Sequence, residues 1–93
     1  MSHPYINIET RDKLIRQSID SLDALSSRYD RGAVDTLGFF DELGRWTRET
    51  NEMLQTAINM KTAQDFNGCS LVEDKKVFLV NLINYGRKRV ILS

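Results

Sequence analysis

The sequence has little cysteine, proline or histidine and no excess of charge of one sign. Cys69 is the only cysteine, so a disulfide framework within the chain is excluded and a reducing compartment is favoured. One proline and five glycines exclude a collagen-like or linker-like composition. The 13 basic residues balance the 13 acidic ones, which excludes binding to DNA through overall positive charge.

Long apolar runs are also missing. The longest, residues 77–80 followed after Asn81 by Leu82 and Ile83, is far shorter than the ~20 residues that span a bilayer. The N-terminal residues show neither the basic region nor the apolar region of a secretory signal. We therefore expect a cytoplasmic protein with no membrane partner.

The remaining composition is that of an ordinary globular domain. Hydrophobic residues make up 41% of the 93 positions and charged residues 28%, which excludes a disordered chain. A chain of this length forms one domain with a modest core, so we expect a single helical domain over residues 1–93. Domains of this size often gain stability by association.

Apolar residues recur at helical spacing from residue 8 to residue 30. The row that repeats every seven residues consists of Ile8, Ile15, Leu22 and Tyr29. This spacing predicts a helix over 8–30 with one buried face. Gly32 suits the left-handed position just past the end of that helix. Residues 1–7 are expected to form an extended lead, with Asn7 as the N-cap.

The middle segment keeps helical spacing from about residue 35 to residue 64, with Asp35 or Asp30 as the N-cap. An unbroken helix of this length would extend about 45 Å, whereas a compact chain of this size has a radius of gyration near 12–13 Å. The helix would reach beyond its own domain. We therefore expect association into a homo-oligomer, most simply a dimer, with a break of the helix at Gly44 as the alternative.

The third segment opens with Ser70 and Glu73 at the spacing of a capping box, which favours a helix. The alternative is a strand over 77–83 that turns at 84–87 and pairs with residues 90–92. Residues 84–93 are expected to be a frayed basic tail. The predicted fold is an all-α three-helix bundle in which the middle helix is the longest.

The sequence offers no catalytic or metal-binding constellation. His3 is the only histidine and lies in the lead, so Cys69 has no evident base and a metal would lack ligands. Gly38 and Gly44 are not followed by the Lys-Ser/Thr of a P-loop, and no helix-turn-helix frame fits. We expect no enzymatic activity, no metal and no cofactor.

Three aromatic residues on the middle helix are the most unusual feature. Phe39, Phe40 and Trp46 fall within eight residues, and we assign Phe40 to the core. Trp46, flanked by Arg45 and Arg48, is of the type that dominates binding hot spots. We therefore predict an exposed partner-binding site formed by Trp46, Phe39, Arg45 and Arg48. The site would serve self-association or a foreign protein partner, and the alternative is that these aromatic residues belong to the core.

This site predicts a non-catalytic protein-binding module, a small regulator or inhibitor that masks a surface of a partner protein. The alternative is a nucleic-acid-associated protein, because residues 69–93 carry five basic and two acidic residues, a net charge of +3. The cluster that would contact nucleic acid consists of Tyr85, Arg87, Lys88 and Arg89. A small ligand bound between chains is a further possibility.

Overall fold

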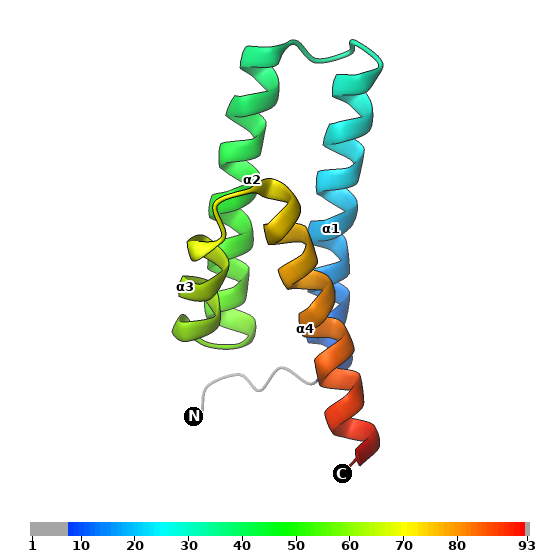
Figure 1. Cartoon of the computed structure of the whole chain (residues 1–93), viewed down its shortest axis with the longest axis vertical. Helices are drawn as coiled ribbons and strands as arrows, with labels where there is room; N and C mark the ends of the chain where they lie inside the picture. The colour runs from blue at the N-terminus through cyan, green and yellow to red at the C-terminus, as the bar shows by residue number, and fades with distance from the viewer. Residues whose placement is uncertain (1–7, 93) are drawn as a thin grey trace.

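The fold is a helical hairpin with two further helices packed on its lower half (Figure 1). The computed structural model describes the backbone of residues 8–92 and the side chains of residues 9–84. That part of the chain contains no strand and four helices: α1 (Ile8–Asp30), α2 (Thr36–Ala57), α3 (Met60–Gly68) and α4 (Val72–Leu92). The predicted all-α class is confirmed, but the number of helices is four and not three.

Two sequence predictions fall on parts that are not described. The extended lead at 1–7, with its N-cap Asn7, lies outside the described residues. The side chains of the predicted basic cluster lie outside them as well: Tyr85, Arg87, Lys88 and Arg89.

Helix α1 has the predicted bounds and ends at the predicted glycine. Gly32 adopts a φ of 77°, in the left-handed region that favours glycine. The Ala33 amide donates to the Arg28 carbonyl at 2.8 Å, and the Gly32 amide donates to the Tyr29 carbonyl at 3.0 Å. These two bonds form a Schellman motif, which satisfies carbonyls at the end of α1 and reverses the chain toward α2.

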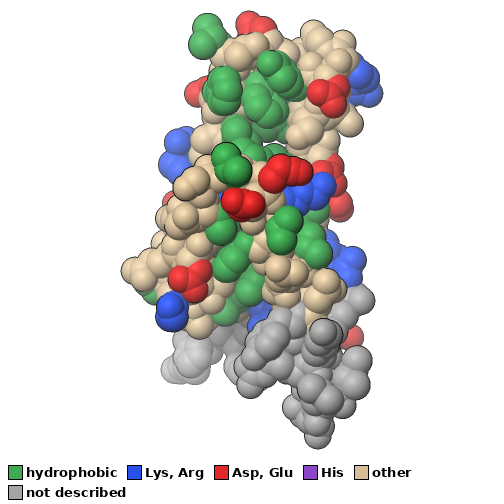
Figure 2. Space-filling model, in the orientation of Figure 1, with side chains coloured by type: hydrophobic (Ala, Val, Ile, Leu, Met, Phe, Trp, Pro, Cys, Tyr) green, Lys and Arg blue, Asp and Glu red, His purple; other side chains and the backbone are tan. Residues whose placement is uncertain are grey.

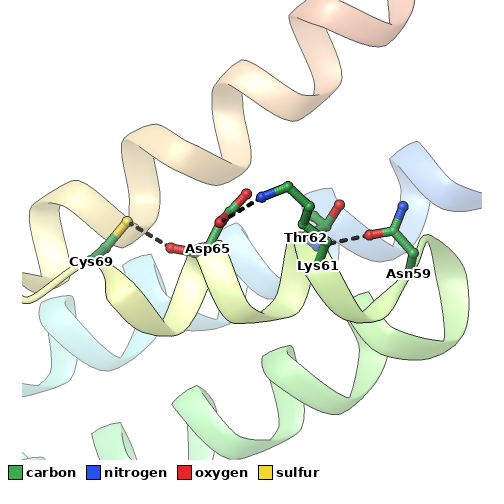
Figure 3. Close-up of polar contacts among 5 residues, drawn as sticks. All are labelled: Asn59, Lys61, Thr62, Asp65 and Cys69. Carbon is green, nitrogen blue, oxygen red and sulfur yellow. Dashed lines mark hydrogen bonds and ion pairs between the residues drawn. The ribbon is translucent and has the colours of Figure 1, made fainter.

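The predicted long middle helix is divided into α2 and α3. Asn59 leaves the helical conformation, with φ −168° and ψ 172°, and its side chain accepts a hydrogen bond from the Thr62 amide at 2.7 Å (Figure 3). This N-cap starts a new helix, so α3 folds back along α2. A break at Gly44 was the wrong alternative, because α2 continues through that residue. At 22 residues, α2 is also not the longest helix, since α1 has 23.

The start of the middle segment follows the sequence prediction, whereas its end lies beyond the predicted residue 64. The Asp35 side chain accepts from the Gly38 amide at 2.7 Å and caps α2. Helix α3 ends at Gly68, where the Cys69 thiol contacts the Asp65 carbonyl at 3.6 Å (Figure 3).

Helix α4 confirms the helical prediction for the third segment over the strand alternative. The helix begins at Val72, and the described side chains show no capping box between Ser70 and Glu73. Lys75 connects α4 to the end of α3 instead. Its ammonium donates a hydrogen bond to the Cys69 carbonyl and lies 5.4 Å from the centre of the Phe66 ring. The backbone remains helical to Leu92, through most of the segment where we expected fraying.

The hydrophobic core lies where α3 and α4 meet the hairpin. Phe66 of α3 is fully buried at its centre, with ring centroids 5.8 Å from Trp46 and 6.1 Å from Phe78. The buried core cluster consists of Ile15, Leu22, Trp46, Leu54, Ala63, Phe66, Leu79 and Ile83. All four helices contribute to this cluster, so the lower half of the molecule is the stable part of the fold.

The upper half of the hairpin is not covered by α3 or α4 (Figure 1). The molecule measures 46 × 28 × 21 Å and has a radius of gyration of 14.4 Å. A compact chain of 93 residues has a radius of gyration of about 12 Å. The elongation leaves surfaces of both α1 and α2 open, and the candidate sites lie on these surfaces.

Candidate functional site

An open groove runs along the α1–α2 hairpin. Its volume is about 340 Å³, and α1 lines it from Leu14 to Arg28. The lining residues are Leu14, Gln17, Ser18, Ser21, Leu25, Arg28, Glu42, Arg45, Trp46, Glu49, Thr50 and Met53. The buried residues of this lining are Leu25, Trp46 and Thr50, so the floor of the groove is mostly apolar and includes one threonine. The groove is a preformed concave surface with an apolar floor.

Trp46 is a core residue and not the exposed anchor that the sequence predicted. Its side chain is only 7% exposed, and its ring stands edge to face with Phe66. The indole Nε1–H donates to the Ser18 carbonyl of α1 at 2.7 Å, which satisfies its one polar group. Trp46 faces inward because it lies on the side of α2 that packs on α1.

The rim of the groove carries charges of both signs. Arg28 of α1 and Glu42 of α2 form a part-buried ion pair at 2.8 Å and close the upper end. Further down, Glu49 and Glu52 are exposed beside Leu14 and Met53, where the groove continues toward Ala57. Neither carboxylate has an ion pair with a described side chain. The lower end of the groove is therefore acidic.

A second open surface lies at the tip of the hairpin. Tyr29 of α1 stacks on Phe39 of α2 with ring centroids 4.4 Å apart, and Phe39 contacts Phe40 edge to face at 5.7 Å. Phe40 is 61% exposed and Leu37 is 82% exposed. We call these four residues the hairpin patch. Figure 2 shows hydrophobic side chains gathered on this upper part of the molecule.

The assignment of Phe40 to the core was wrong for a reason of tertiary packing. Phe40 lies on the apolar row that reaches Leu54 in the core. Helix α3 packs beside the lower part of α2, where Asn51 donates to the Ala63 carbonyl. It leaves the upper part of α2 uncovered (Figure 1). The same row is thus buried in the lower half of α2 and open in the upper half.

The four predicted partner-binding residues do not form one site. Arg45 and Trp46 line the groove, Phe39 belongs to the hairpin patch, and Arg48 is exposed on α2 outside both. Sequence reasoning missed the α1 side of the groove, which includes Leu14, Ser18 and Ser21. Their signal was a second row at helical spacing beside the seven-residue row of α1, in which two serines lie between Leu14 and Leu25.

Other chemistry is sparse in the described part of the chain. The side chains described there include no group of three His, Cys, Asp or Glu residues placed to hold a metal ion. Cys69 is half-buried and its thiol donates to a backbone carbonyl. Among the described residues, no helix combines the length and hydropathy that crossing a membrane requires.

Comparison of the chain with protein-family models, with curated proteins and with solved structures found no match.

Proposed function

We propose that the chain is a non-catalytic protein-binding module that masks an amphipathic helix of a partner protein in the α1–α2 groove. The observation that carries this proposal is an open groove with an apolar floor between two antiparallel helices. A third helix that packs its apolar side chains between two others is a recurrent mode of recognition. A regulator of this kind acts by covering the surface that its partner uses elsewhere.

The dimensions of the groove suit a short helix. From Leu14 to Arg28, α1 lines the groove over 15 residues, which corresponds to about 21 Å or four helical turns. A bound helix of that length presents apolar side chains at i, i+3, i+4 and i+7 to Leu14, Leu25 and Met53. The charges of Arg28 and Glu42 neutralise each other at the upper end of the groove, so a charged side chain of the bound helix gains little binding energy there.

The charges of the groove define the chemistry of the partner helix. Glu49 and Glu52 are exposed carboxylates without an ion pair among the described side chains. A lysine or arginine of the bound helix pairs with them when its apolar face lies on the floor. The groove therefore fits a helix with an apolar stripe and a basic residue at the end nearest Glu52.

Site-specific photo-crosslinking in lysate of the source cells tests this proposal. A photo-reactive residue replaces Ser21 in the groove, and the matched control carries it at Gln64, an exposed residue of α3. We expect one protein to cross-link from position 21 and not from position 64, with the adduct in an amphipathic helix. Glu49→Lys combined with Glu52→Lys is expected to reduce that cross-link at least tenfold.

Three outcomes contradict the proposal. Equal cross-linking from positions 21 and 64 would show that capture does not involve the groove. An unchanged cross-link yield with the two lysine substitutions would show that the acidic end of the groove does not contribute to recognition. Loss of every adduct after nuclease treatment would show that nucleic acid bridges the contact, as the alternative prediction for the basic C-terminal end requires.

A further inference from the structure

One face of α2 points away from the groove and carries residues at helical spacing that are exposed, apart from the half-buried Gly44. The residues of this outer stripe are Leu37, Phe40, Asp41, Gly44 and Arg48. On a helix with 3.6 residues per turn, these positions lie within an arc of about 100°. Leu37 and Phe40 are the two most exposed large apolar side chains of α2. The stripe therefore offers apolar surface at its N-terminal end and a glycine at its centre.

The charges of the outer stripe are ordered along the helix. Asp41 precedes Gly44 by three residues, and Arg48 follows it by four. Both side chains are exposed, and neither has an ion pair with another described side chain. Two helical turns separate Asp41 from Arg48, so they are too far apart on one helix to pair directly.

We propose that a second copy of this chain covers the outer stripe, with the two α2 helices antiparallel and crossing at Gly44. In a two-fold arrangement about Gly44, Asp41 of each copy faces Arg48 of the other, because their offsets from the axis are nearly equal and opposite. The stripe is thus complementary to itself in charge. A parallel arrangement would place Asp41 against Asp41 and Arg48 against Arg48, which is repulsive.

Gly44 allows the two helices to approach closely at the crossing point. A Cβ added at this residue would meet only the end of the Arg48 side chain, whose guanidinium would lie at a contact distance of 3.9 Å. Because Gly44 has no side chain of its own, two helices that cross there with Arg48 turned toward the partner's Asp41 pack closer than the usual 8–10 Å. Close packing at the centre brings Leu37 and Phe40 of each copy onto the α2 helix of the other.

The net charge of the upper half of the hairpin also favours a second copy as the occupant. Residues 24–48, which form the upper half of the hairpin, contain four acidic and four basic residues, a net charge of zero. A surface without net charge meets its own copy without long-range repulsion, and it does not attract a strongly charged partner such as nucleic acid.

This inference is independent of the proposed function. The groove is lined by a different set of residues, none of which belongs to the outer stripe. Failure of the dimer therefore leaves the groove proposal intact, and failure of the groove proposal leaves the dimer intact.

Sedimentation equilibrium of the full chain over a wide concentration range tests the proposal. The wild type is expected to rise from 10.7 kDa toward twice that mass. Asp41→Arg alone and Arg48→Asp alone are each expected to weaken association at least tenfold, because each creates two like-charge contacts in the symmetric dimer. The double variant Asp41→Arg with Arg48→Asp exchanges the charges and is expected to restore association.

Two further variants separate the interface from general effects. Phe40→Ser removes apolar surface from the stripe and is expected to weaken association without loss of helical circular dichroism. Asp20→Arg makes the same change of charge on the exposed surface of α1 and is expected to leave association unchanged. A wild type that stays at 10.7 kDa at every concentration overturns the proposal, and so does a double variant that remains as weak as the single ones.

Discussion

Replacement of Trp46 by phenylalanine distinguishes a core residue from a surface anchor. The substitution removes the Nε1–H that donates to the Ser18 carbonyl at 2.7 Å, and a lost hydrogen bond of this kind costs about 1 kcal/mol. It also removes roughly 40 Å³ of side chain from a site that is 7% exposed, which costs about another 1 kcal/mol at 24 cal/mol per Å³ of cavity. We therefore expect the free energy of unfolding to fall by about 2 kcal/mol.

Chemical denaturation followed by far-ultraviolet circular dichroism measures this loss without the tryptophan signal. In a domain of this size, a loss of about 2 kcal/mol lowers the Tm by roughly 8–16 °C. The control is Val77→Ala on the exposed surface of α4, which is expected to change stability by no more than about 0.5 kcal/mol. If Trp46→Phe is as neutral as Val77→Ala, Trp46 is a surface residue and the described core is wrong.

Three other predictions follow from single contacts. Gly32→Ala should lower the free energy of unfolding by about 1–2 kcal/mol in urea denaturation, because a φ of 77° strains any residue with a Cβ although no atom lies in its way; an unchanged midpoint would contradict the Schellman ending. Asp35→Ala should lower the free energy of unfolding by about 0.5–2 kcal/mol, because the side chain that accepts from the Gly38 amide is lost. Asp35→Ser should retain most of that free energy, and equal losses for the two variants would exclude a capping role. The hydrogen bond and charge of Asp23 raise the pKa of Lys76 above its usual 10.5. The Lys76–Asp23 ion pair therefore stabilises the fold fully below pH 10.5, and this stabilisation is lost as the pH rises through the raised pKa. Lys76→Met should remove that alkaline decline from the pH dependence of the Tm, and a decline identical to that of the wild type would refute the pairing.

The parts of the fold that follow local rules were accessible from the sequence. The seven-residue apolar row and the glycine at position 32 define α1 from Ile8 to its end. Both signals depend only on residues that are close in the sequence. Asp35 caps α2 for the same reason. The division at Asn59 was missed because apolar residues continue at helical spacing on both sides of it, at Ile58 and Met60. Asn59 itself is a preferred N-cap residue and was the available signal.

The candidate site was less accessible, because burial depends on contacts between distant segments. Phe40 and Trp46 both lie on apolar rows of α2, and the spacing alone does not tell which row is covered. The answer depends on where α3 ends and on the distant Ser18 carbonyl that accepts from Trp46. Local periodicity therefore identified the aromatic residues, but it predicted a buried Phe40 and an exposed Trp46, which is the reverse of the structure.

Hydrogen exchange at two protein concentrations tests the central claim most directly, because it locates the surface that a second copy covers. At high concentration, we expect added protection of the α2 amides around Gly44, from Leu37 to Arg48, relative to the same amides in dilute protein. The amides of α3, which packs within its own chain, are expected to exchange at the same rate in both samples. If the amides around Gly44 exchange equally at both concentrations while the protein is dimeric, the outer stripe of α2 is not the interface.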